Sequence, residues 1–399
     1  MNPPLEFIKR NIGPSMKPEK LSLKAKELVD KIVSKIMMGQ DSWKLNQTYR
    51  EHRLTEFPKG NLFYSIVREI REEIERFSKI GKEYSFTIGR RTFTIYAIYP
   101  YETGIRISPE KIYKMLDESV IKMYIWLYVV CDFIGEQSTC SPQLTIYWYL
   151  TKQSKKIPEI NGELIDEINA NTGFTMACPS VANSIYIYRR EEWFKVFIHE
   201  TIHSFGVDFA QMPEDKVNRA IFQIFGVQCD LRLYEAYTET WAEIINAIFV
   251  CMTPPPEVVE NALNNERMFS LFQKTKVLDH QQIKYRELCV PSIHRKKYAE
   301  RTPVFSYFII KSILMFHYND FIEWCVENNR GTFVFQKTDT NVGGFIEFIR
   351  SHYQSPRYIE ATDHYDKWFS QNRHKKDIHM NSLRMSVSDK YMKTNIKKS

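Results

Sequence analysis

The pattern with the clearest chemistry is a histidine, a glutamate and a second histidine spaced as HExxH, at His199, Glu200 and His203. Residues four apart on an α-helix lie about 40° from each other around its axis, so both imidazoles project from one face and can bind one ion. Neutral imidazole suits Zn²⁺. Glu200 can accept a proton from a zinc-activated water and later deliver it to a leaving amine. Because a random order of these residues gives about 0.02 such matches, the pattern predicts a zinc site.

A third protein ligand is needed, and the spacing of the chain limits where it can lie. Metzincins carry a third histidine three residues after the glycine that follows HExxH. That glycine is Gly206 here, and the position of the third histidine is Phe209, which cannot bind zinc. Asp208 is adjacent but out of register. The sequence therefore excludes the metzincin arrangement.

A second acidic segment, Leu233–Glu243, resembles the gluzincin pattern Glu-(Gly/Ala)-x-x-(Glu/Asp). The resemblance implies that Glu235 is the third ligand and that Glu239 is a carboxylate that orients one histidine. Helical geometry leaves a second register open, with Glu239 as the ligand and Glu243 behind it. Aromatic residues surround these carboxylates, so the helix should be buried, and a cation is a natural partner for a buried carboxylate.

Hydrolysis also needs a group that stabilises the oxyanion. Zincins often take a tyrosine or histidine for this purpose from the C-terminal lobe. Tyr307 is the candidate here, with His280 and His317 behind it. The competing interpretation of Tyr307 is an ordinary core tyrosine.

The elements around the motif predict an α+β fold. A strand at 184–188 precedes the metal helix, as zincins require of their substrate-binding edge, and Gly206 is a suitable C-terminal residue for that helix. Further elements are predicted from hydrophobic periodicity and turn signals. These are helices at 21–38, 61–77 and 109–133 (with Ser108 as N-cap), strands within 85–99 and at 143–151, and helices at 214–226, 231–251, 256–274, 303–318 and 343–352.

This order of elements predicts three parts. Residues 1–80 form a helical N-terminal extension, residues 81–210 an α/β zincin lobe that carries the HExxH helix, and residues 211–399 a helical C-terminal lobe that carries the third ligand. The expected fold is zincin-like, with a mixed sheet and an active-site helix packed on a mostly helical C-terminal lobe.

Composition excludes several classes of protein. The net charge of +7 is modest for 399 residues and no nucleic-acid-binding module is visible, so no nucleic-acid partner is expected. The longest apolar run, Met123–Cys131, is too short to span a membrane, and the N-terminus lacks a signal core. Seven widely spaced cysteines predict reduced, buried thiols. The expected protein is soluble and intracellular, of unknown oligomeric state.

Three segments together resemble one family: residues 171–175, Glu191–Glu200, and Glu235–Glu243. They are similar to zincin-like metallopeptidases encoded by large nucleocytoplasmic DNA viruses of the mimivirus and phycodnavirus type. The likeness runs from about residue 80 to residue 389 and includes residues 304–307 and 382–385. It implies a peptidase that acts on a polypeptide, located in the host cytoplasm or the virion.

The functional prediction is a zinc-dependent, gluzincin-like peptidase with Glu200 as general base. One alternative is a catalytically inert zincin-fold scaffold or virion-associated protein. Glu200 argues against inertness, because a purely structural zinc site does not need it, and no cysteine lies within the motif. The other alternative is a zinc hydrolase of a non-peptide amide or ester, since HExxH identifies the water-activating device and not the bond that is cut.

Overall fold

The computed structural model describes residues 3–13, 16–101, 107–227, 229, 231–253, 258–290, 298–372 and 377–388. The chain divides into two compact units. The sheet unit comprises residues 29–154 and 172–207, and the helical unit comprises residues 1–28, 155–171 and 208–389. Residues 1–80, expected as a separate extension, are thus divided between the two units.

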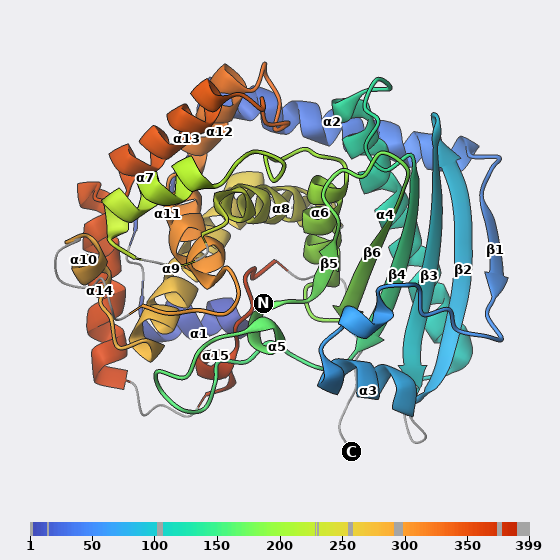
Figure 1. Cartoon of the computed structure of the whole chain (residues 1–399), viewed down its shortest axis with the longest axis horizontal. Helices are drawn as coiled ribbons and strands as arrows, with labels where there is room; N and C mark the ends of the chain where they lie inside the picture. Colours follow the sequence, from blue (N-terminus) through green and yellow to red (C-terminus); the bar gives the residue numbers. More distant parts are fainter. Residues whose placement is uncertain are drawn as a thin grey trace. The chain divides into compact units, whose positions relative to one another are not determined.

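The sheet unit contains a six-stranded mixed sheet in the order β1-β2-β3-β4-β6-β5 (Figure 1). Its strands are β1 (Arg50–Arg53), β2 (Ser78–Ile88), β3 (Arg91–Tyr101), β4 (Gln143–Thr151), β5 (Gly173–Thr175) and β6 (Ala182–Arg189). β3, β4 and β6 run parallel, whereas the β1–β2, β2–β3 and β5–β6 pairs are antiparallel. The predicted strand–turn–strand within 85–99 is confirmed as the β2–β3 hairpin, which turns at Gly89 with a positive φ of 56°.

Helices cover both faces of this sheet. α4 (Pro109–Ile134) packs beside β2 and β3, and α6 (Trp193–Ser204) packs beside β5 and β6. Ser108 caps α4 as predicted, and its Oγ accepts a hydrogen bond from the Lys111 amide. On the opposite face, η1 (Phe63–Ser65) and α3 (Arg68–Arg76) pack against Tyr149 and Tyr186. Successive strand residues alternate between the two faces, which is why Trp148 contacts Trp193 on the α6 side.

The predicted helix at 61–77 is interrupted in the structure. Ile66 has an extended backbone (φ −66°, ψ 136°), so the segment divides into η1 and α3. Ile66 is buried in the same cluster as Phe63, Ile70 and Ile74. Packing of this side chain against the sheet accompanies the break, which helical periodicity alone did not predict.

The helical unit is built around α8 (Leu233–Met252) and α9 (Val259–His280), whose side chains are largely buried. α9 packs against α8, α11, α14, α1 and η2. The remaining helices include α12 and α14, which periodicity did not predict. The full set of these remaining helices is α1 (Pro3–Asn11), α5 (Glu167–Ala170), α7 (Asp215–Phe225), α10 (Tyr285–Leu288), η2 (Phe305–Ile310), α11 (Lys311–Phe316), α12 (Tyr318–Asn328), α13 (Asp339–His352), α14 (Pro356–Asn372) and α15 (Ile378–Asn381). α2 (Leu23–Leu45) contributes residues to both units.

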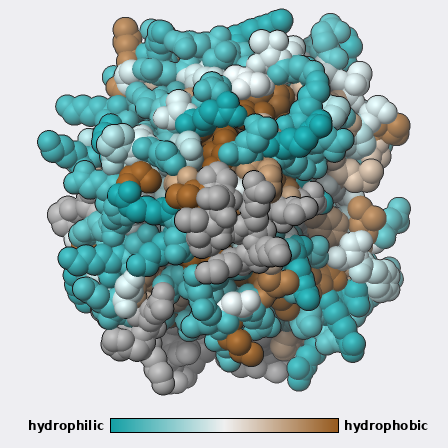
Figure 2. All heavy atoms as spheres, turned by 60° about the vertical axis from the view of Figure 1, so that its left-hand side comes forward, coloured by the Kyte–Doolittle hydropathy of each residue, from teal (hydrophilic) through white to brown (hydrophobic). Residues whose placement is uncertain are grey.

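The expected α+β class is confirmed in its general form, as a mixed sheet with many helices. The face drawn in Figure 2 is mainly hydrophilic, with hydrophobic residues in several separate groups. Within the described residues, no helix combines the length and the apolar character needed to cross a bilayer. The three prolines at 254–256, which predict a helix break, lie outside the described residues, as does most of the polar segment 290–302, which is predicted to be a loop.

Candidate metal centre

α6 carries the HExxH motif and is held firmly within the sheet unit. The chain leaves β6 and enters the helix through Glu192, whose backbone is left-handed (φ 56°), and all twelve residues of α6 are buried. The Trp126 indole of α4 donates a hydrogen bond to Thr201 Oγ1 at 2.6 Å. Thr201 lies between the two histidines of the motif, so this bond fixes the helix close to them.

The C-terminal end of α6 is fixed by backbone bonds and by a buried polar network. The Gly206 amide donates to the His203 carbonyl and the Val207 amide to the Ile202 carbonyl, with φ 61° at Gly206. This is a Schellman motif, and it confirms the predicted role of Gly206. Ser141 Oγ lies 2.9 Å from Ser204 Oγ, and Asn183 Nδ2 donates to both hydroxyls. These contacts stabilise the turn of the helix from which His203 projects.

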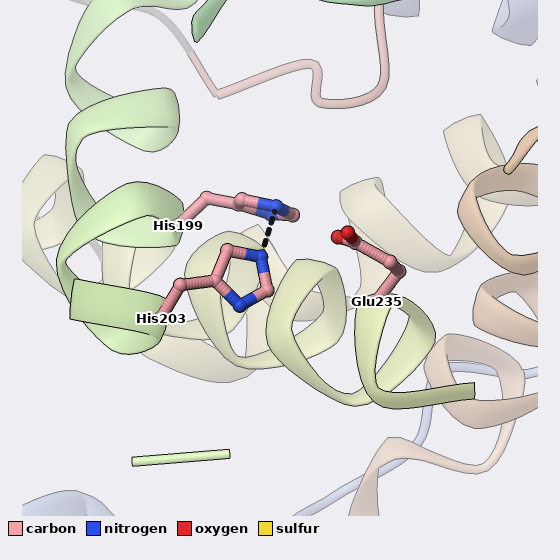
Figure 3. Close-up of side chains that lie close together, drawn as sticks. All are labelled: His199, His203 and Glu235. Carbon is pink, nitrogen blue, oxygen red and sulfur yellow. Dashed lines mark hydrogen bonds between the residues drawn. The ribbon is translucent and has the colours of Figure 1, made fainter. Parts of the chain in front are cut away.

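The two imidazoles of the motif face one another on one side of α6 (Figure 3). Their Nε2 atoms lie 3.0 Å apart, and both side chains are buried, with 6% and 7% exposed for His199 and His203. Two ligands bound at 2.0–2.1 Å in a tetrahedron are about 3.3 Å apart. The 3.0 Å contact is a hydrogen bond between the rings, drawn as a dashed line in Figure 3, and its length is close enough to this spacing that the two nitrogens could also share a cation.

Glu235 is the third member of this group. One donor atom each from His199, His203 and Glu235 lies within 4.8 Å of the others, and these three buried residues could hold a metal ion. Glu235 lies in the first turn of α8, and Figure 3 shows its carboxylate together with the two rings. Two imidazoles and one carboxylate are a donor set used by catalytic zinc sites, so the residues present fit the ion.

The other carboxylates of α8 have different surroundings. Glu239 is 1% exposed and is not a member of the group formed by the two histidines and Glu235. Glu243 accepts a hydrogen bond from Lys311 Nζ at 2.7 Å, and both side chains are fully buried. Burial raises the pKa of Glu243 well above its usual range, although the Lys311 charge opposes the shift. Glu243 is thus a partner of Lys311, which disfavours the register that places it behind a ligating Glu239.

The candidates for oxyanion stabilisation are all buried in the helical unit. Tyr307 lies in the π-helix η2, and its role stays a prediction. His280 Nε2 lies 2.9 Å from the Glu163 carbonyl oxygen. His317 lies beside Asp320 and His352, in a separate group of possible metal ligands.

The residues that ruled out a metzincin have structural roles. The Phe209 ring lies 4.4 Å from the Phe335 ring, centroid to centroid, within an aromatic cluster that includes Tyr237. Asp208 is almost fully buried, and its Oδ2 accepts a hydrogen bond from Thr238 Oγ1 of α8 at 3.0 Å. Phe209 therefore fills the core at the position where metzincins carry a third histidine.

The strand at the edge of the sheet differs from the expected one. Residues 184–188 form a strand as predicted, but this strand, β6, is paired on both sides, with β4 and with β5. The outer strand on this side of the sheet is β5, antiparallel to β6 and packed beside α6, while β1 forms the other edge. A Cβ atom at Gly173 would lie 2.7 Å from the Tyr186 carbonyl oxygen and 3.3 Å from Glu200 Cγ, so only glycine allows this close approach. The signal missed was the short segment of residues 173–175, too brief for a periodicity argument.

The prediction that all seven cysteines are reduced is wrong for Cys140 and Cys178, which form a disulfide. Cys131, Cys229, Cys251, Cys289 and Cys325 are thiols that lie outside this disulfide. The Cys178 amide donates a hydrogen bond to the His203 carbonyl at 3.1 Å, so the disulfide lies next to the C-terminal end of α6. Their separation of 38 residues gave no sequence signal for the pairing.

Reduction of this disulfide is expected to destabilise the sheet unit. A cross-link that closes a loop of this length contributes about 3–4 kcal/mol in the chain-entropy treatment. Denaturant unfolding, monitored with and without a phosphine reductant, should show the loss. A Cys140→Ser/Cys178→Ser variant should be equally destabilised and insensitive to the reductant. Alkylation of all seven cysteines in native, unreduced protein would contradict the prediction.

Comparisons of the chain with known protein families, with curated proteins and with solved structures found no match. The resemblance to viral zincin-like metallopeptidases therefore stays a prediction.

Proposed function

We propose that the protein is a zinc-dependent peptidase in which His199, His203 and Glu235 hold the ion. The observation that carries this proposal is the group of two buried imidazoles and one buried carboxylate whose donor atoms lie within 4.8 Å of one another. A bound zinc ion would lower the pKa of a water and polarise the scissile carbonyl. Three protein ligands leave a coordination position open, as catalytic zinc sites require.

Glu200 is proposed as the general base. It lies between the two histidines in the sequence of α6, and it is only 6% exposed. A carboxylate in this position can take the proton of the attacking water and return it to the leaving amine. The same buried setting strengthens its interactions with charge that develops in the transition state.

The edge strand supports a peptide over other substrates. β5 pairs with β6 on one side only, and it packs against the helix that carries Glu200. An extended peptide can add to such an edge through main-chain hydrogen bonds, in the manner of β-augmentation. Added there, its backbone would run beside α6, and a carbonyl of the peptide could reach the base.

The test is proteolysis by the purified, zinc-loaded protein. It is expected to cleave casein or members of a peptide library, to lose activity when zinc is chelated, and to recover when Zn²⁺ is added back. A protein that binds zinc but cleaves only ester or non-peptide amide substrates would replace the peptidase proposal with the broader hydrolase. Absence of bound metal from the pure protein would contradict the site itself.

A further inference from the structure

A second group of possible metal ligands lies within the helical unit. It consists of His317, Asp320 and His352, and one donor atom of each lies within 4.8 Å of the others. His317 is the residue between α11 and α12, Asp320 lies in the first turn of α12, and His352 is the last residue of α13. Segments separated along the chain therefore present two imidazoles and a carboxylate to one point.

The ring of His352 is held with one nitrogen directed to that point. Its Nδ1 lies 2.8 Å from the Phe348 carbonyl oxygen, and the ring stacks on Phe348 with centroids 4.1 Å apart. A carbonyl can only accept, so Nδ1 carries the proton in the neutral ring, and Nε2 presents a lone pair. Nε2 is the nitrogen that faces Asp320, with its Oδ2 at 3.4 Å.

His317 also has one nitrogen bonded to the protein and the other directed to Asp320; Ser355 Oγ can donate or accept, so this bond allows either tautomer. Its Nε2 lies 2.9 Å from Ser355 Oγ, and its Nδ1 faces Asp320 Oδ2 at 3.7 Å. A hydrogen bond from the outer nitrogen to the protein is how ligating histidines are commonly oriented. Only 5% of the His317 side chain is exposed, so this ring is fixed by packing as well.

Asp320 Oδ2 forms ion pairs with both rings when they are protonated, and the same spacings fit a cation held between neutral rings and the carboxylate. Charge-assisted N–H···O bonds are usually about 2.7–2.9 Å long, shorter than both contacts of Asp320 Oδ2. Ligands in a zinc tetrahedron are about 3.3 Å apart, close to the observed 3.4 and 3.7 Å. The Asp320 side chain is 44% exposed, so an ion could enter from solvent and keep water as a further ligand.

We propose that His317 Nδ1, His352 Nε2 and Asp320 Oδ2 form a second site for a divalent ion of the zinc type. Imidazole and carboxylate donors suit Zn²⁺ and Co²⁺ over Mg²⁺ or Ca²⁺, which prefer oxygen ligands alone. A bound ion would join the start of α12 to the end of α13. The site shares no residue with the proposed active centre, so it stands independently of the peptidase proposal.

The test measures metal stoichiometry by equilibrium dialysis against Zn²⁺ at about pH 8, where free imidazoles are neutral. A His199→Ala/His203→Ala variant removes the ligands on α6 and should still bind one equivalent. Adding His352→Gln or Asp320→Asn should lower the remaining affinity more than about 100-fold, since changes near ligands already cost 10–100-fold. Co²⁺ should give a visible absorption band that the same substitutions remove. His364→Gln, an exposed histidine on α14, is the matched control and should change nothing.

Zinc binding lost already in a correctly folded His199→Ala/His203→Ala variant would overturn the second site, as would affinity unchanged by both His352→Gln and Asp320→Asn. If the double variant does not fold, the single variants decide. His352→Gln should bind one equivalent less than wild type, and an equal stoichiometry would overturn the proposal. If the centre on α6 binds no metal, wild type should bind one equivalent that only substitutions at the second site remove.

Discussion

Glu200→Gln is expected to lower kcat/KM for peptide hydrolysis by about 10²–10⁴-fold while leaving bound zinc unchanged. The substitution keeps the shape of a side chain whose Cγ lies close to Gly173, so the packing of α6 against β5 should persist. It removes only the ability to take a proton from the attacking water. The proposed ligands are untouched, which separates the loss of chemistry from the loss of the ion.

The measurement pairs activity on a peptide substrate with zinc content by atomic absorption. Glu72→Gln is the matched control, because Glu72 lies in the same unit, is exposed and pairs only with Arg68 on the surface. The control should retain wild-type activity. Equal activity in Glu200→Gln and wild type would rule out Glu200 as the general base.

Glu235→Ala is expected to weaken zinc binding by more than about 100-fold and to abolish hydrolysis. Substitutions of residues that only orient a ligand typically cost 10–100-fold in metal affinity, so loss of a direct ligand should cost more. It would also remove the one carboxylate among the three proposed ligands, which partly balances the charge of a divalent ion. Zinc affinity can be measured by competition with a chromogenic chelator.

Glu239→Ala is the matched variant, since Glu239 lies one turn further along the same buried helix. It should weaken zinc binding less than Glu235→Ala does. The reverse order would show that Glu239 is the ligand and that Glu235 has another role. Thermal unfolding of both apo variants checks that neither change acts by unfolding α8.

Local sequence patterns were sufficient for several elements. The β2–β3 hairpin, β4, the Ser108 cap and the Gly206 terminus were all predicted, because turn chemistry and alternation act over a few residues. α12 and α14 were missed, and the helix at 61–77 is divided at Ile66. In these cases packing against distant segments outweighs local periodicity.

What the sequence determined by itself is the pairing of His199 and His203 with Glu200, since spacing along one helix fixes which side chains share a face. It also excluded the metzincin arrangement, because position 209 is a phenylalanine and not a histidine. Tertiary structure alone decided the rest. It grouped Glu235, and not the alternative Glu239, with the histidines, joined Cys140 to Cys178, made β5 an edge strand beside α6, and gathered His317, Asp320 and His352. Each of these depends on residues far apart in the chain, whose proximity arises only when hydrophobic burial brings their elements together.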